Sequence, residues 1–233
     1  MKPAAGWFDA LPKDRLLAEF SLWSADLARV ADDIARVDQH VDIYHVDVAD
    51  GHFSPALLYF PDLLAAVRKL TRKPLHVHLM VDDRILLAQI EQFAEAGADL
   101  ISIHAENDNV GAGLDLIHSL GLPAGVVLQL ATPVEAAEDL LPRISLLTLL
   151  GTGIGVKGQG LDPEAPGRIA AARRLVAASG FPVRVAADGG IREHTVPELR
   201  AHGAETIVMG SLAFGAPDLA ARISWVHAQP HGG

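Results

Sequence analysis

The chain has 233 residues, of which half are hydrophobic and 21% are charged, and its formal net charge is −10. A chain of this length can bury a large core as one domain, and its negative charge disfavours a nucleic-acid partner because it repels phosphate backbones. It has no cysteine, no apolar stretch long enough to cross a bilayer and no start typical of a secretion signal, so we expect a protein with no disulfides and no membrane partner, located in the cytoplasm.

Short runs rich in Val, Ile and Leu alternate with amphipathic segments rich in Ala and Leu from about residue 20 to residue 228. This alternation is typical of βα units and a parallel sheet. The expected strands span residues 20–23, 43–48, 75–81, 100–105, 125–130, 146–150, 183–188 and 206–211. The expected helices span residues 26–37, 62–70, 85–97, 112–121, 133–141, 166–180, 195–203 and 218–228.

The repetition of roughly eight such units predicts an α/β fold of one domain, a (β/α)8 TIM barrel. A doubly wound open sheet uses the same alternation, but no G-x-G-x-x-G turn follows the first strand. We expect the domain to cover residues 1–233, with an N-terminal extension at 1–18 and a flexible tail at 229–233. The segment 7–20 lies outside the barrel pattern, and we expect it either to cap the bottom of the barrel or to make a subunit contact.

Polar side chains lie on three of the expected strands. His45 and Asp47 are two residues apart and so point to the same face of their strand, as do His76, His78 and Met80 on the next. Asp188 ends the seventh strand. In a barrel of parallel strands, inward residues near the carboxyl ends form the active site.

Two imidazoles and two carboxylates at one barrel mouth predict a metal site formed by His45, Asp47, His78 and Asp188. A single histidine on a strand is more often a hydrogen-bonded structural residue, but an uncompensated carboxylate at this place is costly. Mixed nitrogen and oxygen ligands suit one divalent ion of zinc, iron, manganese or cobalt better than magnesium or calcium. For His76 and His104, hydrogen bonding to a ligand residue and plain packing remain open alternatives.

Glycines mark the two loops that commonly bind phosphate in this fold, Gly189 and Gly190 after the seventh strand and Gly210 with Ser211 after the eighth. Glycine lets backbone N–H groups approach an anion closely. Ordinary tight turns are the alternative for either pair alone. The glycine-rich loop 151–160 is expected to be a lid or a flank of this site, with Lys157 and Gln159 within reach of a ligand, or else a merely mobile loop.

Six motifs resemble those of ribulose-phosphate 3-epimerases in order and spacing, and they cover the chain from Ser21 to Gly215. They are SLWSAD, HVDVADGHF, HLMV, KGQG, DGGI and GSLAFG. The resemblance implies a (β/α)8 barrel, one divalent metal ion and metal-dependent inversion at C3 of a ketose phosphate, with D-ribulose 5-phosphate and D-xylulose 5-phosphate as the typical pair. It also implies a homo-oligomer, a dimer or a hexamer.

By position, the resemblance assigns residue roles. The metal ligands would be His45, Asp47, His78 and Asp188, and the two aspartates would also be the catalytic pair that transfers protons through an enediolate. The expected substrate-binding residues are Ser21, His78, Met80, Gln159, Gly189, Gly190, Gly210 and Ser211.

The chain also departs from the family pattern. Ala49 stands where methionine is usual, His76 replaces a common acidic residue, and residues 149–151 read Leu-Leu-Gly instead of a methionine followed by N-P-G-F-G-G-Q. These changes leave the expected ligands and the acid/base pair intact but reshape the substrate pocket.

Three other functions therefore remain open. The first is 3-epimerisation of another ketose phosphate, such as allulose 6-phosphate or a four-carbon sugar phosphate. The second is a phosphate-binding barrel lyase or decarboxylase, which tends to carry D-x-K-x-x-D where this chain reads D-V-A-D. The third is a sugar-phosphate sensor without catalysis.

Overall fold

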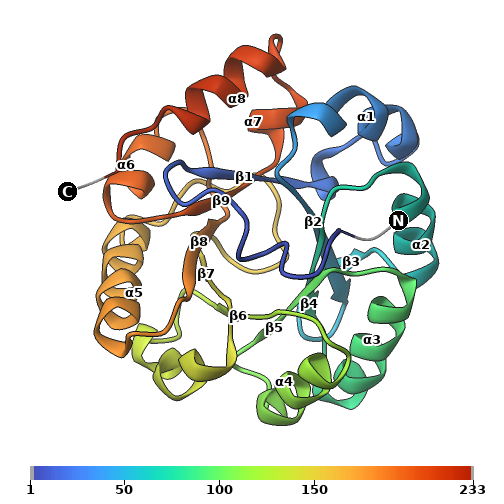
Figure 1. The fold of residues 1–233 in the computed structure, drawn as a ribbon, viewed down its shortest axis with the longest axis vertical. Coiled ribbons are helices and arrows are strands. Elements are labelled where there is room, and N and C mark those ends of the chain that lie inside the picture. The colour runs from blue at the N-terminus through green and yellow to red at the C-terminus, as the bar shows by residue number, and fades with distance from the viewer. Residues whose placement is uncertain (1–2, 232–233) are drawn as a thin grey trace.

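Eight parallel strands close into a barrel in the computed structural model, which describes residues 3–231 (Figure 1). The ring closes because β1 pairs in parallel with both β2 and β9. The barrel strands are β1 (Leu17–Ser21), β2 (Ile43–Asp50), β4 (Leu75–Met80), β5 (Leu100–His104), β6 (Ala124–Leu128), β7 (Leu146–Leu150), β8 (Arg184–Asp188) and β9 (Thr206–Met209). A short strand, β3 (Leu57–Leu58), adds to the end of β2 in antiparallel orientation.

Helices surround the barrel and alternate with its strands (Figure 1). The α-helices are α1 (Val30–Val37), α2 (Pro61–Leu70), α3 (Asp83–Ala96), α4 (Val110–Ser119), α5 (Ala165–Ser179), α6 (Val196–Ala201), α7 (Ser211–Phe214) and α8 (Leu219–His227). Three 3₁₀ helices, η1 (Leu22–Ser24), η2 (Asp38–His40) and η3 (Val134–Arg143), complete the set in the described chain. No helix of residues 3–231 is long and apolar enough to cross a membrane.

The barrel prediction is confirmed, and the differences from the expected elements are local. The first strand begins at Leu17 rather than at residue 20, so the last residues of the predicted extension belong to the barrel. The segment expected to be an α-helix at 133–141 is the 3₁₀ helix η3, which contains Pro142, a residue that cannot donate a backbone hydrogen bond. The short elements β3 and α7 were not predicted.

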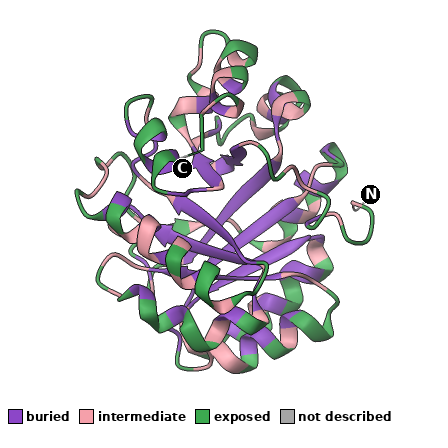
Figure 2. Cartoon of the chain, turned by 60° about the vertical axis from the view of Figure 1, so that its left-hand side comes forward, coloured by how far each residue is buried: buried purple, intermediate pink, exposed green. Residues whose placement is uncertain are grey.

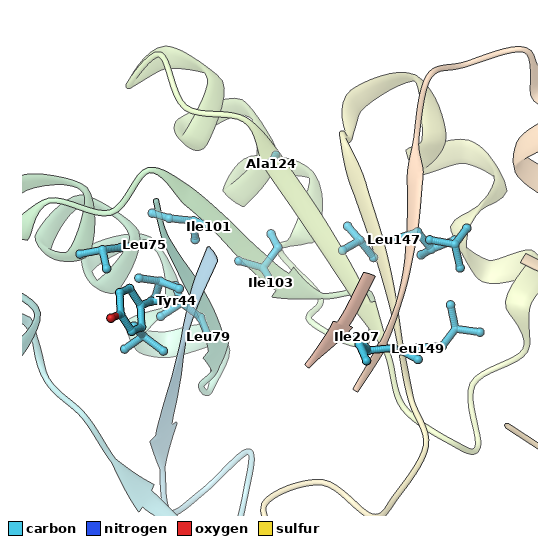
Figure 3. Packing of buried hydrophobic residues seen from close by; sticks show 14 of the residues in the cluster. Tyr44, Leu75, Leu79, Ile101, Ile103, Ala124, Leu147, Leu149 and Ile207 are labelled. Atoms are coloured by element: carbon cyan, nitrogen blue, oxygen red, sulfur yellow. The ribbon is translucent and has the colours of Figure 1, made fainter. Parts of the chain in front are cut away.

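Each barrel strand has an outer face that packs against the helices and an inner face that fills the barrel. Figure 2 shows the strands buried throughout and the helices exposed on one side only. Figure 3 shows part of the outer layer, in which Leu79, Ile103 and Leu147 belong to one hydrophobic cluster. Because side chains alternate along a strand, residues with the other parity, such as His45 on β2, point into the barrel.

The N-terminal segment crosses one end of the barrel (Figure 1). Phe8 packs against Leu100, Leu146 and Ala186, which are inward residues of β5, β7 and β8. Arg184 reaches from the start of β8 and donates to the backbone carbonyls of residues 11 and 12, at 2.8 and 3.0 Å. The segment therefore closes the end of the barrel where the strands begin. The last two residues of the predicted flexible tail, 232 and 233, lie outside the described part.

Gly125 on β6 gives a test of how tightly the barrel interior is packed. A Cβ atom at this position would stand 2.0 Å from the Ser102 hydroxyl oxygen. We expect Gly125→Ala to lower the free energy of unfolding by about 1–3 kcal/mol, because the neighbour must move and give up its hydrogen bond to His76. Urea unfolding followed by circular dichroism measures the change.

The matched control is the same substitution at Gly167, in the first turns of α5. A Cβ atom there meets nothing within 4 Å, and the backbone is helical. We expect Gly167→Ala to raise the free energy of unfolding by about 0.4–1 kcal/mol, because alanine loses less backbone entropy on folding. Equal effects of the two substitutions would contradict the packing described for Gly125.

Candidate active site

A cavity of about 250 Å³ opens where the barrel strands end. Asp47, Met80, Leu150 and Asp188 line it at or near the ends of β2, β4, β7 and β8, and the loops after β1, β7, β8 and β9 form the rest of its wall. The cavity is lined by the predicted residues Ser21, Asp47, His78, Met80, Gln159, Asp188, Gly189, Gly190, Gly210 and Ser211. His45 is the exception, because it lies fully buried beneath the floor.

Four side chains meet at the floor. The Nε2 atom of His45 stands 3.2 Å from Asp47 Oδ1 and 3.7 Å from Asp188 Oδ2, while His78 Nδ1 stands 3.5 and 3.7 Å from the same two oxygens. Tetrahedral ligands at about 2.0–2.2 Å from an ion lie about 3.3–3.6 Å from one another. The four distances between imidazole nitrogens and carboxylate oxygens are therefore close to those around an ion of this size, and all four donor atoms lie within 4.8 Å of one another.

The imidazole nitrogens at the floor support the same conclusion. His45 Nε2 and His78 Nδ1 are buried, and neither has a hydrogen-bond partner among the described residues. Buried polar atoms are nearly always satisfied, so two orphan nitrogens beside two carboxylates fit a site for a cation. His45, Asp47, His78 and Asp188 could thus hold a metal ion through two nitrogens and two oxygens.

Hydrogen bonds behind the imidazoles decide which nitrogen faces the floor. His45 Nδ1 lies 2.9 Å from Glu19 Oε2, so it donates to the carboxylate and leaves Nε2 as the nitrogen that can bind an ion once its proton is displaced. His78 Nε2 lies 2.9 Å from His104 Nε2, and His104 Nδ1 lies 2.9 Å from Glu106 Oε2. Because Glu106 accepts only, His104 donates to it through Nδ1, accepts from His78, and leaves His78 Nδ1 free for an ion.

A second group that could hold an ion consists of Glu19, His45 and His76. Here, however, the facing atoms already have partners, because Glu19 Oε2 accepts from Nδ1 of both histidines and His76 Nε2 lies 2.7 Å from the Ser102 hydroxyl. This group is therefore described by hydrogen bonds rather than by an ion. For His76 and His104, the open choice between hydrogen bonding and packing is resolved in favour of hydrogen bonding.

Burial and neighbouring charges move the pKa values of the floor residues in opposite directions. Burial raises the pKa of Asp188 to about 6, and the nearby charge of Asp47 adds to the effect. Burial also opposes ionisation of Asp47, but His45 and His78 outweigh it and hold the pKa of this carboxyl far below its usual range. Burial lowers the pKa of His45, yet the charge of Asp47 overcomes it and raises that pKa well above 6.5.

The glycine pairs occupy positions that demand glycine. Gly189 and Gly190 have φ angles of +90° and +69°, and Cβ atoms there would stand 2.3 Å from Thr152 Oγ1 and 2.6 Å from Leu161 Cα. Tight packing against the loop after β7 thus accounts for both glycines. Both glycines line the cavity, and without side chains their backbone can be approached closely by an anion.

The loop 151–160 reaches across the cavity to the loop after β1. Lys157 Nζ donates to the Trp23 carbonyl at 2.7 Å and lies 5.8 Å from the centre of the Trp23 ring. Gln159 Oε1 accepts from Gly153 N at 2.8 Å, which stiffens the loop from within. The loop is therefore tethered in this structure, and both side chains line the cavity.

Sequence reasoning missed Glu19, Glu106 and Arg192. Glu19 lies on β1, within the segment 7–20 that was expected to lie outside the barrel, and Glu106 lies just past the end of β5. The spacing of His104 and Glu106 was the only available signal for the latter, since side chains two residues apart share a face. Arg192 comes two residues after Gly190, and both residues line the cavity.

Comparison with known proteins identifies relatives. A family model described as the ribulose-phosphate 3 epimerase family matches residues 17–214. A ribulose-phosphate 3-epimerase of Synechocystis sp. is 37% identical over 210 residues, which cover 88% of this chain and 90% of the relative. The corresponding enzyme of Escherichia coli (strain K12) is 35% identical over 203 residues, which cover 85% of this chain and 88% of the relative.

Solved structures with low sequence identity share the fold. A 3-hexulose-6-phosphate synthase superposes with a TM-score of 0.67 at 18% identity, covering 92% of this chain and 99% of that one. An orotidine 5'-phosphate decarboxylase from Pyrococcus horikoshii superposes with a TM-score of 0.64 at 14% identity, covering 90% and 97%. These two likenesses support the barrel architecture alone.

The protonation of the floor predicts how metal binding depends on pH. Without an ion His45 holds a proton, since its pKa is raised, and below pH 6 Asp188 holds another. An ion must displace these protons, so we expect its affinity to rise with pH and its binding to release about one proton at pH 7 and close to two at pH 5.5. Zinc titration calorimetry in buffers of different ionisation enthalpy counts the protons.

The control for this measurement is His202→Gln, which removes a surface imidazole bonded only to the Glu198 carbonyl. This variant should release as many protons as the unaltered protein. A zinc affinity that stays constant between pH 5.5 and pH 7 would contradict the assignment of the floor residues.

Proposed function

The chain belongs to the ribulose-phosphate 3-epimerase family, and we propose that it inverts C3 of a ketose phosphate, interconverting D-ribulose 5-phosphate and D-xylulose 5-phosphate. It is accordingly an isomerase of the epimerase class. The observation that carries this proposal is the floor of the cavity, where Asp47 and Asp188 arrive from β2 and β8 and meet two imidazoles whose free nitrogens face them.

Inversion beside a ketone requires one group to remove a proton from carbon and another to deliver a proton to the opposite face. We assign these roles to Asp47 and Asp188, which exchange them with the direction of the reaction. Such a pair needs one member ionised while the other holds a proton. Without an ion the two carboxyls differ in the required sense, because burial and the charge of Asp47 raise the pKa of Asp188 while His45 and His78 hold the pKa of Asp47 low. The Ser21 hydroxyl donates to Asp47 Oδ2 at 2.7 Å and orients the carboxylate.

The metal ligands in this proposal are His45, Asp47, His78 and Asp188, and the ion is zinc, iron, manganese or cobalt. When bound, a divalent ion of this kind stabilises the negative charge of the enediolate that forms after the proton leaves C3. The two histidines have no acid/base role in this proposal. Nδ1 of His45 bonds to Glu19, Nε2 of His78 bonds to His104, and the other nitrogen of each ring is assigned to the ion.

Other wall residues position the sugar phosphate. We place the phosphate against the backbone of Gly189 and Gly190, next to Gly210 and Ser211, with Arg192 on the same wall. The remaining substrate-binding side chains are Met80, His78 and Gln159. The apolar side chains of Met80 and Leu150 reduce access of water to the floor.

Two observations weigh the alternative functions. The lysine that would indicate a related lyase or decarboxylase is missing from β2, and the lysine that does line the cavity, Lys157, lies on the loop after β7. Ala49 on β2 stands beside Met80 in register and is smaller than the methionine usual there in the family, which favours a six-carbon substrate such as allulose 6-phosphate as the second candidate. A sensor without catalysis would not need both carboxylates.

Assembly and location complete the proposal. We propose a homo-oligomer, a dimer or hexamer, and we note that Leu57 and Phe60 beside β3 are 80% and 58% exposed. The complete absence of cysteine agrees with a reducing cytoplasm. Analytical ultracentrifugation measures the assembly state directly.

The proton-transfer role of Asp188 is tested by Asp188→Asn. We expect formation of C3-deuterated xylulose 5-phosphate from ribulose 5-phosphate to fall by about 10²–10⁴-fold, because the amide cannot exchange a proton with carbon on its side of the enediolate. Proton NMR in deuterium oxide follows the exchange, and metal content is measured on the same samples.

The matched control is Asp115→Asn, which alters an exposed carboxylate paired with Arg143 far from the cavity wall. It should exchange at the unaltered rate. Exchange by a metal-loaded Asp188→Asn at that same rate would refute the assignment.

The identity of the sugar is tested by kcat/KM on ribulose 5-phosphate, allulose 6-phosphate and erythrulose 4-phosphate. We expect the five-carbon substrate to be preferred. In Ala49→Met, the added side chain should reduce kcat/KM for the six-carbon substrate relative to the five-carbon one by roughly tenfold or more. An unchanged ratio of the two kcat/KM values would show that residue 49 does not limit the size of the sugar.

A further inference from the structure

Glu19 is a buried carboxylate that the proposed reaction does not use. It lies on β1 with no exposed surface, on the inner face of the barrel, and its Oε2 atom lies 2.9 Å from His45 Nδ1 and 2.8 Å from His76 Nδ1. Its other oxygen, Oε1, has no partner among the described residues. A single oxygen of the carboxylate therefore accepts hydrogen bonds from two imidazoles.

The stability of the barrel does not account for this carboxylate. Burying a charge is costly even when it is hydrogen-bonded, and apolar side chains of similar volume fill such space at lower cost. The neighbouring inward positions on the same and the next strand, Leu17 and Ile43, are apolar and fully packed. A charge at Glu19 thus needs a reason other than packing.

The hydrogen bonds around Glu19 form one chain across four neighbouring strands. Ser102 on β5 bonds to His76 on β4, His76 bonds to Glu19 on β1, and Glu19 bonds to His45 on β2. The His45 and His76 rings also meet edge to face, with centroids 4.7 Å apart. In this hydrogen-bonded series, His76 fixes the position of Glu19, and Glu19 together with the His76 ring fixes the plane of the His45 ring.

Only one nitrogen of His45 can then face the floor. Its Nδ1 atom must carry a hydrogen to bond to Glu19, so Nε2, 3.2 Å from Asp47, is the nitrogen that gives up its proton and offers a lone pair when an ion binds. Carboxylates that accept from a metal-ligating histidine fix its tautomer and increase its basicity. Behind His78 the corresponding carboxylate is the partly exposed Glu106, which is linked to His78 through His104. Glu19, in contrast, is fully buried and accepts the hydrogen bond of His45 without an intervening residue.

We propose that Glu19, held by His76 and Ser102, is the positioning carboxylate of the metal centre, and that it strengthens metal binding by fixing and polarising His45. The inference rests on the metal site of the proposed function. Glu19 touches neither substrate nor ion, so its effect reaches the reaction through His45 alone.

The test compares metal affinity in Glu19→Gln, Glu19→Ala and the unaltered protein. Carboxylates in this role contribute 10–100-fold to affinity. We therefore expect the zinc dissociation constant, measured by competition with a chelator, to rise about tenfold in the glutamine variant, which keeps an acceptor but loses the charge, and about 100-fold in the alanine variant. The visible spectrum of the cobalt-loaded protein should change in both.

The matched control is Thr206→Val, which alters another buried inward side chain on β9 whose hydroxyl has no partner among the described residues. Its zinc affinity and cobalt spectrum should equal those of the unaltered protein. Thermal unfolding of all metal-free variants identifies any general loss of stability. A purely structural Glu19 would lower the unfolding temperature and leave affinity and spectrum unchanged, and this outcome would overturn the inference.

A measurement on the unaltered zinc-loaded protein covers the case in which the variants do not fold. Proton NMR with ¹⁵N-labelled histidine should show a downfield Nδ1–H resonance for His45, as expected for a donor to a carboxylate. A Nε2–H tautomer would overturn the inference while leaving the metal site in place. Failure of the unaltered protein to bind zinc, cobalt or manganese would instead refute the metal centre of the proposed function.

Discussion

Charge compensation at the floor of the barrel is the constraint on which the rest of the site depends. Asp47 and Asp188 lie within a few ångströms of each other in a place with little water, where like charges repel strongly and carboxylates lose hydration. The surrounding residues meet this cost with imidazoles rather than with lysine or arginine. Imidazole can exchange its positive charge for a lone pair, so the same four side chains accommodate either protons or an ion.

Much of the fold and the floor of this site could be predicted from the sequence because a strand has a period of two. That period predicts His45 with Asp47, and His76 with His78, on inner faces, and the alternation of strand and helix patterns predicts the barrel. The same reasoning placed Asp188 at the end of its strand. The structure brings all of these side chains together at one floor or directly beneath it.

The parts that could not be predicted depend on boundaries and on contacts across the barrel. A shift of three residues in the start of β1 hid Glu19, because its segment has the composition of a surface extension rather than of an apolar strand. The difference at His76 looked like an isolated departure from the family pattern, whereas it is one half of a bonded pair with Glu19. Likewise, the tether between Lys157 and Trp23 joins residues 134 positions apart. No local pattern encodes such a pairing.

The N-terminal segment affects how substrate can enter the enzyme and product can leave it. Phe8 packs against inward side chains at the start of three strands, and Arg184 binds the carbonyls of residues 11 and 12, so this end of the filled barrel is covered. The cavity therefore opens only at the other end in the described part of the chain, where the loop bearing Lys157 contacts the loop after β1. A substrate and its product must then pass through the same opening, and a bound molecule excludes the next one.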